Sequence, residues 1–263
     1  PSPWAPLGPT RAAHTCPICR WEGDEFLGGF HSESATCPQC GSVSRDRFLF
    51  WCMVRRSPER TGARLLETSP RMGADYREAM GTWFQYLCSD YDLSAHKGVV
   101  QLDLQAIDRP DASFDLVLTP HVLEHVPDTG AALRELHRVM APGGRVYLQV
   151  PVLQGATAPP TEPEFHGDNT PVFWRFGFDL TDQLRAVGFE STLLCTDGWI
   201  AAVDEGLSEW PTGTSGEFDV ASMLAGVRRA DLQSVADDGL SHRFGFLPAY
   251  MFLTWECVKP SAG

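Results

Sequence analysis

Long apolar runs and lysine are the two things that the sequence lacks most clearly. Hydrophobic residues make up 43% of its 263 positions, yet no stretch reaches the roughly 18 consecutive apolar residues that a membrane-spanning helix needs. Residues 1–11 contain no apolar core of a secretory signal. The sequence therefore argues against an integral membrane protein, and we expect a cytoplasmic one.

Lysine occurs only twice among 21 cationic residues, and the others are arginine. Residues 1–60 hold seven basic and six acidic side chains, whereas residues 61–263 hold 14 basic and 28 acidic ones. A body this acidic repels the phosphate backbone of a nucleic acid, which argues against such a partner. Internal repeats are also lacking, and the length fits one large domain with a small appendage.

Cysteine, in contrast, is concentrated near the start of the chain. Four of the eight cysteines form two pairs within 25 residues, Cys16 with Cys19 and Cys37 with Cys40. Each Cys-x-x-Cys pair places two thiolates on one tight turn, and two such turns complete a tetrahedron around a zinc ion. Disulfides are disfavoured without an export signal, and two adjacent redox pairs would be unusual. Four thiolates leave no open position, so we expect a structural zinc site.

The zinc ligands define a first predicted unit, residues 1–60. Residues 12–45 are too few to build a core, and metal binding can supply the missing folding energy. A helical pattern over residues 46–56 follows, and Ser57-Pro58 ends it. We therefore predict a zinc ribbon joined by a helix to a second unit, residues 61–263.

From residue 63 onward, runs of strand length alternate with helical patterns. The expected strands are 63–67, 84–90, 99–103, 114–119, 145–150 and 191–196, and the expected helices are 72–80, 131–140 and 179–187. This alternation predicts a parallel sheet covered on both faces. A last strand at 253–258 is expected to run antiparallel at the sheet edge, and insertions are expected at about 151–178 and 199–247.

Three consecutive predicted strands end in an acidic residue, namely Glu67, Asp90 and Asp103. In parallel sheets the ligand lies beyond the carboxyl ends of the strands, where a carboxylate can accept the hydroxyls of a ribose. Each acid alone is better explained as a helix cap or turn former. Three in order, one βα unit apart, favour a nucleotide-like ligand.

Three stretches of this region resemble class I S-adenosylmethionine-dependent methyltransferases: residues 98–118, the Leu-Glu-His-Val-Pro-Asp motif within 121–128, and the Arg-Val-Met-Ala-Pro-Gly-Gly motif within 133–144. The resemblance covers roughly residues 61–198. The Cys-Pro-x-Cys-Gly-Ser tract at 37–42 is similar to a bacterial subgroup with an N-terminal ribbon. The resemblance implies an enzyme with a Rossmann-like seven-stranded sheet, mostly parallel with an antiparallel edge strand.

The first loop of this sheet departs from the family pattern of an acid followed by three alternating glycines. Here the loop runs from Glu67 to Gly73, and Ser69 and Arg71 stand where two glycines are usual. Glycine lets the backbone approach the cofactor closely. Serine is small, whereas Arg71 must point away or contact the cofactor carboxylate.

Carried over residue by residue, the resemblance also implies an S-adenosylmethionine site. It assigns Glu67, Ser69 and Gly73 to the methionine end, Asp90 to the ribose, and Tyr91 to the side of the adenine. It further assigns Asp103 and Leu104 to the adenine amine and ring, and Thr119 to the wall between cofactor and substrate.

Histidines supply the candidate catalytic groups. Methyl transfer needs alignment, and it needs a base only if the acceptor must lose a proton. His121 and His125 follow the fourth strand, and His166 lies in the 151–178 insertion. Each can act as a base near neutral pH. For His125 a hydrogen-bonding role within its turn is the favoured alternative, so His121 is the stronger candidate.

These features predict methyl transfer to an oxygen or nitrogen of a small molecule, sugar or peptide in specialised metabolism. One alternative is an rRNA or tRNA methyltransferase, because zinc ribbons accompany such enzymes and five arginines could form a basic face: Arg45, Arg47, Arg55, Arg56 and Arg60. Another alternative is a non-catalytic binding or regulatory subunit, which the altered first loop would explain.

Overall fold

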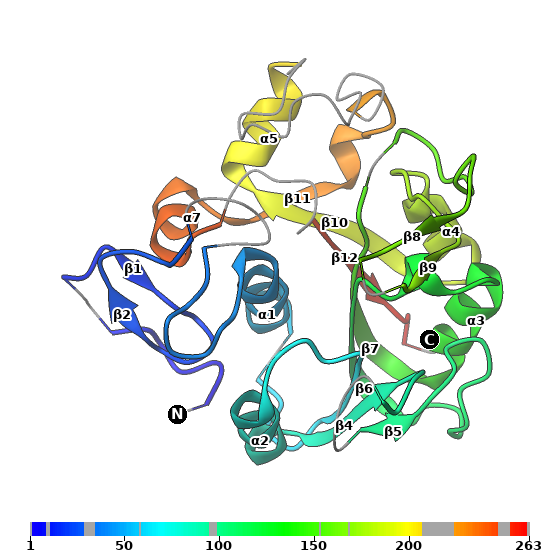
Figure 1. Cartoon of the computed structure of the whole chain (residues 1–263), viewed down its shortest axis with the longest axis horizontal. Coiled ribbons are helices and arrows are strands. Elements are labelled where there is room, and N and C mark those ends of the chain that lie inside the picture. The colour runs from blue at the N-terminus through cyan, green and yellow to red at the C-terminus, as the bar shows by residue number, and fades with distance from the viewer. Residues whose placement is uncertain are drawn as a thin grey trace.

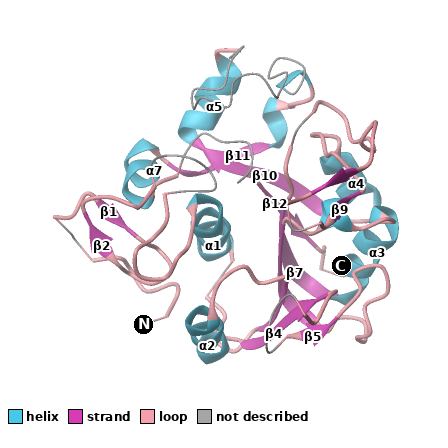
Figure 2. Ribbon diagram, viewed as in Figure 1, coloured by secondary structure: helices cyan, strands magenta, loops and turns pink. Residues whose placement is uncertain are grey.

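The protein is described here from a computed structural model (Figure 1). It describes residues 2–8, 11–28, 35–57, 59–94, 99–152, 154–167, 169–206, 224–246 and 253–261. Within these ranges the chain forms one large sheet with helices on both faces and two small two-stranded sheets (Figure 2). No helix among these residues has the length and apolar character needed to cross a bilayer.

Parallel strands form the half of the large sheet that carries the predicted cofactor site. In spatial order they are β5 (Val100–Gln101), β4 (Gln85–Asp90), β3 (Arg64–Thr68), β6 (Phe114–Pro120) and β7 (Met140–Gln149). Each overlaps a strand that the sequence predicts. Because parallel strands end at the same edge, the residues that follow β3, β4, β5 and β6 form one border, called the carboxyl rim below.

Two features of the sheet correct the sequence prediction. The described sheet has eight strands rather than seven, because β11 (Leu232–Ala236) extends it beside β10 (Glu190–Thr196). The last strand, β12 (Thr254–Val258), is antiparallel as predicted, but it lies between β10 and β7 instead of at the edge. All of its residues except the last are buried. A strand buried on both faces belongs inside a sheet, and its sequence alone does not identify its neighbours.

Helices cover both faces of the sheet (Figure 1). On the face of Leu66 and Val117, buried side chains come from α3 (Thr129–Val139), α4 (Leu180–Ala186) and α5 (Asp197–Asp204). On the face of Leu65 and Leu116 they come from α1 (Ser44–Arg56), α2 (Ala74–Trp83), α7 (Asp238–Phe244) and the N-terminal segment. Neighbouring residues of a strand point to opposite faces, so both layers share one central sheet.

The first helix, α1, connects the cysteine pairs to the sheet. It begins two residues before the predicted start, because the Asp46 carboxylate accepts a hydrogen bond from the Val43 amide (3.0 Å) and caps the first turn. It ends at Arg56, as Ser57-Pro58 predicts. Phe48 and Cys52 on its inner face are fully buried. The helix therefore attaches the cysteine-containing segment directly to the body.

Two short hairpins complete the described fold. The first consists of β1 (His14–Thr15) and β2 (Glu22–Gly23), and Cys16 and Cys19 lie on the turn between them. The second consists of β8 (Glu164–Phe165) and β9 (Pro171–Val172), within the segment 151–178. Both place candidate functional residues in turns.

Candidate functional site

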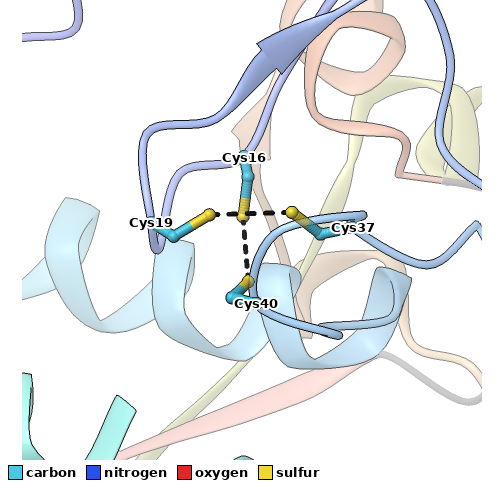
Figure 3. A group of neighbouring side chains, drawn as sticks. All are labelled: Cys16, Cys19, Cys37 and Cys40. Carbon is cyan, nitrogen blue, oxygen red and sulfur yellow. Dashed lines mark hydrogen bonds between the residues drawn. The ribbon is translucent and has the colours of Figure 1, made fainter. Parts of the chain in front are cut away.

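Four cysteines converge on one point beside α1 (Figure 3). The sulfur atoms of Cys16, Cys19, Cys37 and Cys40 lie within 4.8 Å of one another. Cys16 Sγ is 3.7 Å from Cys40 Sγ, and Cys19 Sγ is 3.6 Å from Cys37 Sγ. A zinc ion bound by four thiolates at about 2.3 Å requires sulfur–sulfur edges of about 3.8 Å. The four sulfurs therefore fit a tetrahedral zinc ion, and the group is called the cysteine centre below.

Both turns of the cysteine centre have the same backbone design. In each turn, the amide of the residue after the second cysteine donates to the carbonyl of the first, Arg20 to Cys16 and Gly41 to Cys37, both at 2.9 Å. That residue has a positive φ, 66° at Arg20 and 73° at Gly41. The sequence identifies Gly41 as suited to this conformation. Arg20 adopts it without glycine, and its guanidinium donates to the carbonyls of Ser2, Pro3 and Ala5.

The four thiols of the cysteine centre divide into two that keep their protons and two that lose them more readily. Hydrogen bonds to the other three cysteines raise the pKa of the Cys16 thiol. A hydrogen bond to Cys16 lowers the pKa of the Cys19 thiol, but hydrogen bonds to Cys37 and Cys40 outweigh this effect and raise it. Hydrogen bonds from Cys16 and Cys19 lower the pKa of the Cys40 thiol to about 7. Hydrogen bonding to Cys16 lowers the pKa of the Cys37 thiol as well. Metal ligands of this type must be deprotonated, so a cation that binds here would displace the protons that Cys16 and Cys19 hold.

Arg47 connects the cysteine centre to α7. Its side chain is fully buried, and it donates from Nη1 to the Ser42 carbonyl (2.7 Å) and from Nε to the Phe244 carbonyl (2.8 Å). Its guanidinium also lies 3.9 Å from the centre of the Phe26 ring. Sequence reasoning assigns Arg47 only to a possible basic face and misses this link.

The five arginines considered for a basic face do not form one. Arg45 and Arg47 are buried, and Arg56 forms an ion pair with Glu256 (2.8 Å). The described surface beside α1 therefore lacks the cluster of exposed cations that nucleic-acid binding would use.

The carboxyl rim collects the predicted cofactor residues from four strands. Glu67 and Ser69 lie at the end of β3, Asp90 ends β4, Asp103 follows β5, and Thr119 lies near the end of β6. The registry aligns Thr68 with Ser89 and Glu67 with Leu118. The sheet thus brings together residues that are far apart in sequence, as the strand-end pattern predicts.

Glu67 faces the α2 side of the sheet. It is 4% exposed, and its carboxylate accepts hydrogen bonds from Tyr86 Oη (2.6 Å) and Tyr76 Oη (3.4 Å). Burial raises its pKa to about 7. The Glu67 carboxylate is therefore held by two tyrosine hydroxyls within the protein. Its contact with the methionine end of a cofactor stays a prediction.

The first loop shows why glycine is usual at the position of Ser69. Ser69 has φ 47°, in the left-handed region, and its amide donates to the Ser89 carbonyl (2.7 Å). Gly73 caps α2, and a side chain at that position would meet no atom within 4 Å. The loop keeps the turn and the open space expected beside a ligand, although Ser69 replaces the glycine.

The other acids of the carboxyl rim also form turns. Asp90 Oδ1 accepts the Asp92 amide (3.1 Å), and Asp103 Oδ1 accepts the Gln105 amide (2.8 Å). These contacts match the turn-forming alternative. Tyr91 is 69% exposed, whereas Leu104 is buried. Contact of these two residues with adenine stays a prediction.

Three predicted histidines gather beyond the end of β6. A 3-10 turn, η1 (Leu123–His125), follows His121, which is itself at φ 50°. The His125 ring lies 4.7 Å from the His166 ring, nearly perpendicular to it. His125 Nδ1 lies 2.7 Å from the Pro171 carbonyl, so β9 helps to bring His166 to this place.

Glu124 lies between two of these histidines, and sequence reasoning does not select it. Its Oε1 is 3.7 Å from His121 Nδ1 and 3.8 Å from His125 Nε2. The residue is 2% exposed, and neither carboxyl oxygen accepts a hydrogen bond from the described residues. In the sequence, only its position inside the motif at 123–128 points to Glu124 as a functional residue.

A family model described as "Methyltransferase domain" matches residues 45–194, which is more than half of the chain. The chain belongs to this family. It is a class I S-adenosylmethionine-dependent methyltransferase domain.

Curated relatives of the methyltransferase match over short segments. A ubiquinone/menaquinone biosynthesis C-methyltransferase of Pseudoalteromonas translucida is 43% identical over 49 residues, which are 19% of this chain and 20% of the relative. A tocopherol O-methyltransferase of Arabidopsis thaliana is 45% identical over 56 residues, 20% of this chain and 16% of the relative. The match therefore spans about a fifth of the length of these relatives.

Solved structures resemble the methyltransferase over longer stretches. An S-adenosylmethionine-dependent methyltransferase of Mesorhizobium loti has 15% identity and a TM-score of 0.47, and the similarity covers 81% of this chain and 98% of that one. A phosphoethanolamine N-methyltransferase of Haemonchus contortus has 16% identity and a TM-score of 0.46, with 82% and 53% covered.

Three buried hydroxyls test the fit of the methyltransferase to its cofactor. Thr68 Oγ1, Ser89 Oγ and Thr119 Oγ1 have no hydrogen-bond partner in the described part of the chain. They lie near the ends of β3, β4 and β6, respectively, and β3 lies between the other two strands in the sheet. Buried polar groups are normally paired, so this row fits a ligand with hydrogen-bonding groups. Sequence reasoning selected Thr119 and missed the other two.

Proposed function

We propose that this methyltransferase methylates an oxygen or nitrogen of a small molecule, sugar or peptide in specialised metabolism. The observation that carries the proposal is the group of three histidines beyond β6, next to the carboxyl rim. The names of the matched relatives support small acceptors, since they include tocopherol and ubiquinone biosynthesis enzymes.

The cofactor would lie along the carboxyl rim. Ser69 and Gly73 would meet its methionine end, Asp90 its ribose, and Asp103 its adenine amine, with Tyr91, Leu104 and Thr119 lining the site. The orphan hydroxyls of Thr68, Ser89 and Thr119 support this placement. When bound, S-adenosylmethionine supplies an electrophilic methyl group on a sulfonium.

The histidines would hold the acceptor and take its proton. His125 Nδ1 faces a carbonyl oxygen, so this nitrogen carries the proton that it donates to Pro171. In the neutral ring the lone pair is therefore on Nε2, which is the nitrogen that a base needs. His121 and His166 would complete the acceptor side.

We also propose a structural zinc ion in the cysteine centre, and a division into a ribbon with its helix at 1–60 and a methyltransferase unit at 61–263 with insertions at about 151–178 and 199–247. The sulfur distances support the metal. An acidic body and two buried arginines disfavour a nucleic-acid acceptor. We therefore expect the acceptor to be a small molecule or peptide.

Calorimetry with S-adenosylmethionine is the direct test. We expect saturable binding, followed by transfer of a labelled methyl group to a component of a small-molecule extract. Absence of binding at millimolar cofactor would contradict the proposal. Binding without transfer to any extract component would instead favour a regulatory subunit, and labelled RNA would indicate the nucleic-acid alternative.

A further inference from the structure

A fully enclosed carboxyl group stands at the centre of the histidine cluster. Glu124 belongs to η1, and its backbone carbonyl accepts the amides of Phe173 (2.8 Å) and Trp174 (3.3 Å). These bonds hold the turn against the segment that follows β9. The side chain is thereby fixed at a point where water does not reach it.

The charges that face Glu124 come from three elements. His121 and His125 approach the same oxygen, Oε1, at 3.7 and 3.8 Å. Arg45 of α1 and Arg71 of the first loop act from further away and favour the ionised carboxylate. His166 of the second hairpin reaches the group only through the His125 ring.

Burial opposes ionisation more strongly than these cations favour it. It raises the pKa of Glu124 to about 8, so the carboxyl group keeps a proton at neutral pH. Two imidazole nitrogens lie just beyond hydrogen-bond distance of its Oε1 atom. Titratable groups that interact by more than about one pKa unit hold a proton as a set and not as single members.

We propose that Glu124, His121 and His125 form one proton-holding unit, in which Glu124 is the positioning residue that stabilises an imidazolium on the acceptor side. The proposal deepens the proposed function and rests on it for the location of the acceptor. It adds a residue that neither the motif nor the strand ends assign to the reaction.

In the reaction, the proton-holding unit would accept the proton that the methyl acceptor loses. A neutral hydroxyl or amine acceptor loses one proton to Nε2 of His125, while its electron pair forms the bond to the methyl carbon and the carbon–sulfur pair stays on sulfur. The imidazolium then lies beside Glu124. As a carboxylate, Glu124 stabilises that cation, whereas as a neutral acid it does not. The unit therefore becomes a stronger base as Glu124 ionises.

An NMR titration of the imidazole signals tests the unit without an acceptor. Signals are assigned with His121→Gln and His125→Gln. We expect the wild-type rings of His121 and His125 to titrate in two steps, the upper one near pH 8. Glu124→Gln should abolish the upper step in both rings, and Glu124→Asp should retain it at a shifted pH. Glu78→Gln, on an exposed carboxylate of α2, should leave both steps in place.

A single-step wild-type titration, or an upper step that survives Glu124→Gln, would overturn the proton-holding unit. If Glu124→Gln does not fold, the wild-type titration still decides the matter.

The link to methyl transfer has its own measurement on the wild-type protein. S-adenosylmethionine carries a sulfonium that S-adenosylhomocysteine lacks, and a nearby positive charge favours a carboxylate. We expect the upper step to lie at lower pH with the first ligand than with the second. Equal values would remove the unit from the reaction, whereas failure of both ligands to bind would contradict the proposed function itself.

Discussion

The cysteine centre and the carboxyl rim both collect polar side chains from separate turns, but they are held in place by different means. The centre repeats one local turn twice, and each turn fixes its own pair of cysteines through a backbone hydrogen bond. The rim draws single residues from four strands, which the buried core holds in register. Stability of the centre should therefore depend on a metal, and stability of the rim on packing.

The largest effect that we expect is loss of a cysteine ligand, which should destabilise the cysteine centre and leave the sheet folded. Cys37→Ser removes one thiolate from the centre, and structural zinc contributes on the order of 10 kcal/mol in small metal-dependent units. We expect loss of bound zinc by elemental analysis and rapid proteolysis within residues 11–40, while the sheet keeps its circular dichroism. Cys88→Ser, on β4, should keep one zinc per chain; equal zinc loss in both variants would contradict the assignment.

Arg47 is the point where the centre depends on the body. Arg47→Met leaves the carbonyls of Ser42 and Phe244 without their donor, at a cost of about 3 kcal/mol for buried groups. We expect this loss in urea unfolding, together with faster hydrogen exchange in α7. Arg55→Met, on the exposed side of α1, is the control and should change stability by less than about 0.5 kcal/mol.

Glu67 gives the rim a pH dependence of its own between pH 4.5 and 7. Its folded pKa, about 7, lies above its unfolded value near 4.5, so its burial becomes progressively more unfavourable as pH rises from 4.5 to 7. We expect Glu67→Gln to gain roughly 2–3 kcal/mol on the wild type across this window, measured by urea unfolding at several pH values. Glu78→Gln should show no such gain, and a parallel trend in both variants would contradict the prediction.

Backbone conformation allows a matched pair of substitutions, one in each region. Gly41→Ala forces a side chain into φ 73° and should cost about 1–2 kcal/mol. Ser69→Gly relieves the strain at φ 47° and should be stabilising by less than about 1 kcal/mol, because glycine also has a higher unfolded-state entropy. Thermal unfolding measures both, and the same sign for the two changes would contradict the argument.

The smallest effect that we expect is at Thr119 of the rim, where a substitution should lower cofactor affinity without lowering stability. Thr119→Val removes a buried hydroxyl that has no described partner, so stability should hold or rise slightly. Affinity for S-adenosylmethionine should fall about fivefold to tenfold, as one hydrogen bond is worth about 1 kcal/mol. Thr181→Val, which loses the bond from Trp255 Nε1 (3.0 Å), should show the reverse: lower stability and unchanged affinity.

Sequence reasoning succeeded where the deciding interactions are local. The spacing of Cys16, Cys19, Cys37 and Cys40 predicts their convergence, because each pair fixes its own turn. The parallel strands and their shared carboxyl edge also follow from periodicity. The position of β12 did not, since nothing in residues 254–258 states which strands flank it.

Residues whose environment depends on tertiary contacts were missed for the same reason. Arg47 looks like any surface arginine until α7 closes over it. Thr68 and Ser89 become candidate ligand-binding residues only when the strand registry places them side by side. Glu124 becomes unusual only when the segment after β9 covers it, and no local pattern indicates that a glutamate will be enclosed.

The location of β12 also has a consequence for biosynthesis. The strand is the last of the sheet to leave the ribosome, yet it joins β10 and β11 to the remaining strands. Until it is inserted, β7 and β10 both present unpaired edges, which are templates for association with other chains. Nascent chains should therefore expose two unpaired edges until β12 has been synthesised, and chaperones that shield such edges should bind this protein after β10 has emerged and before β12 has paired.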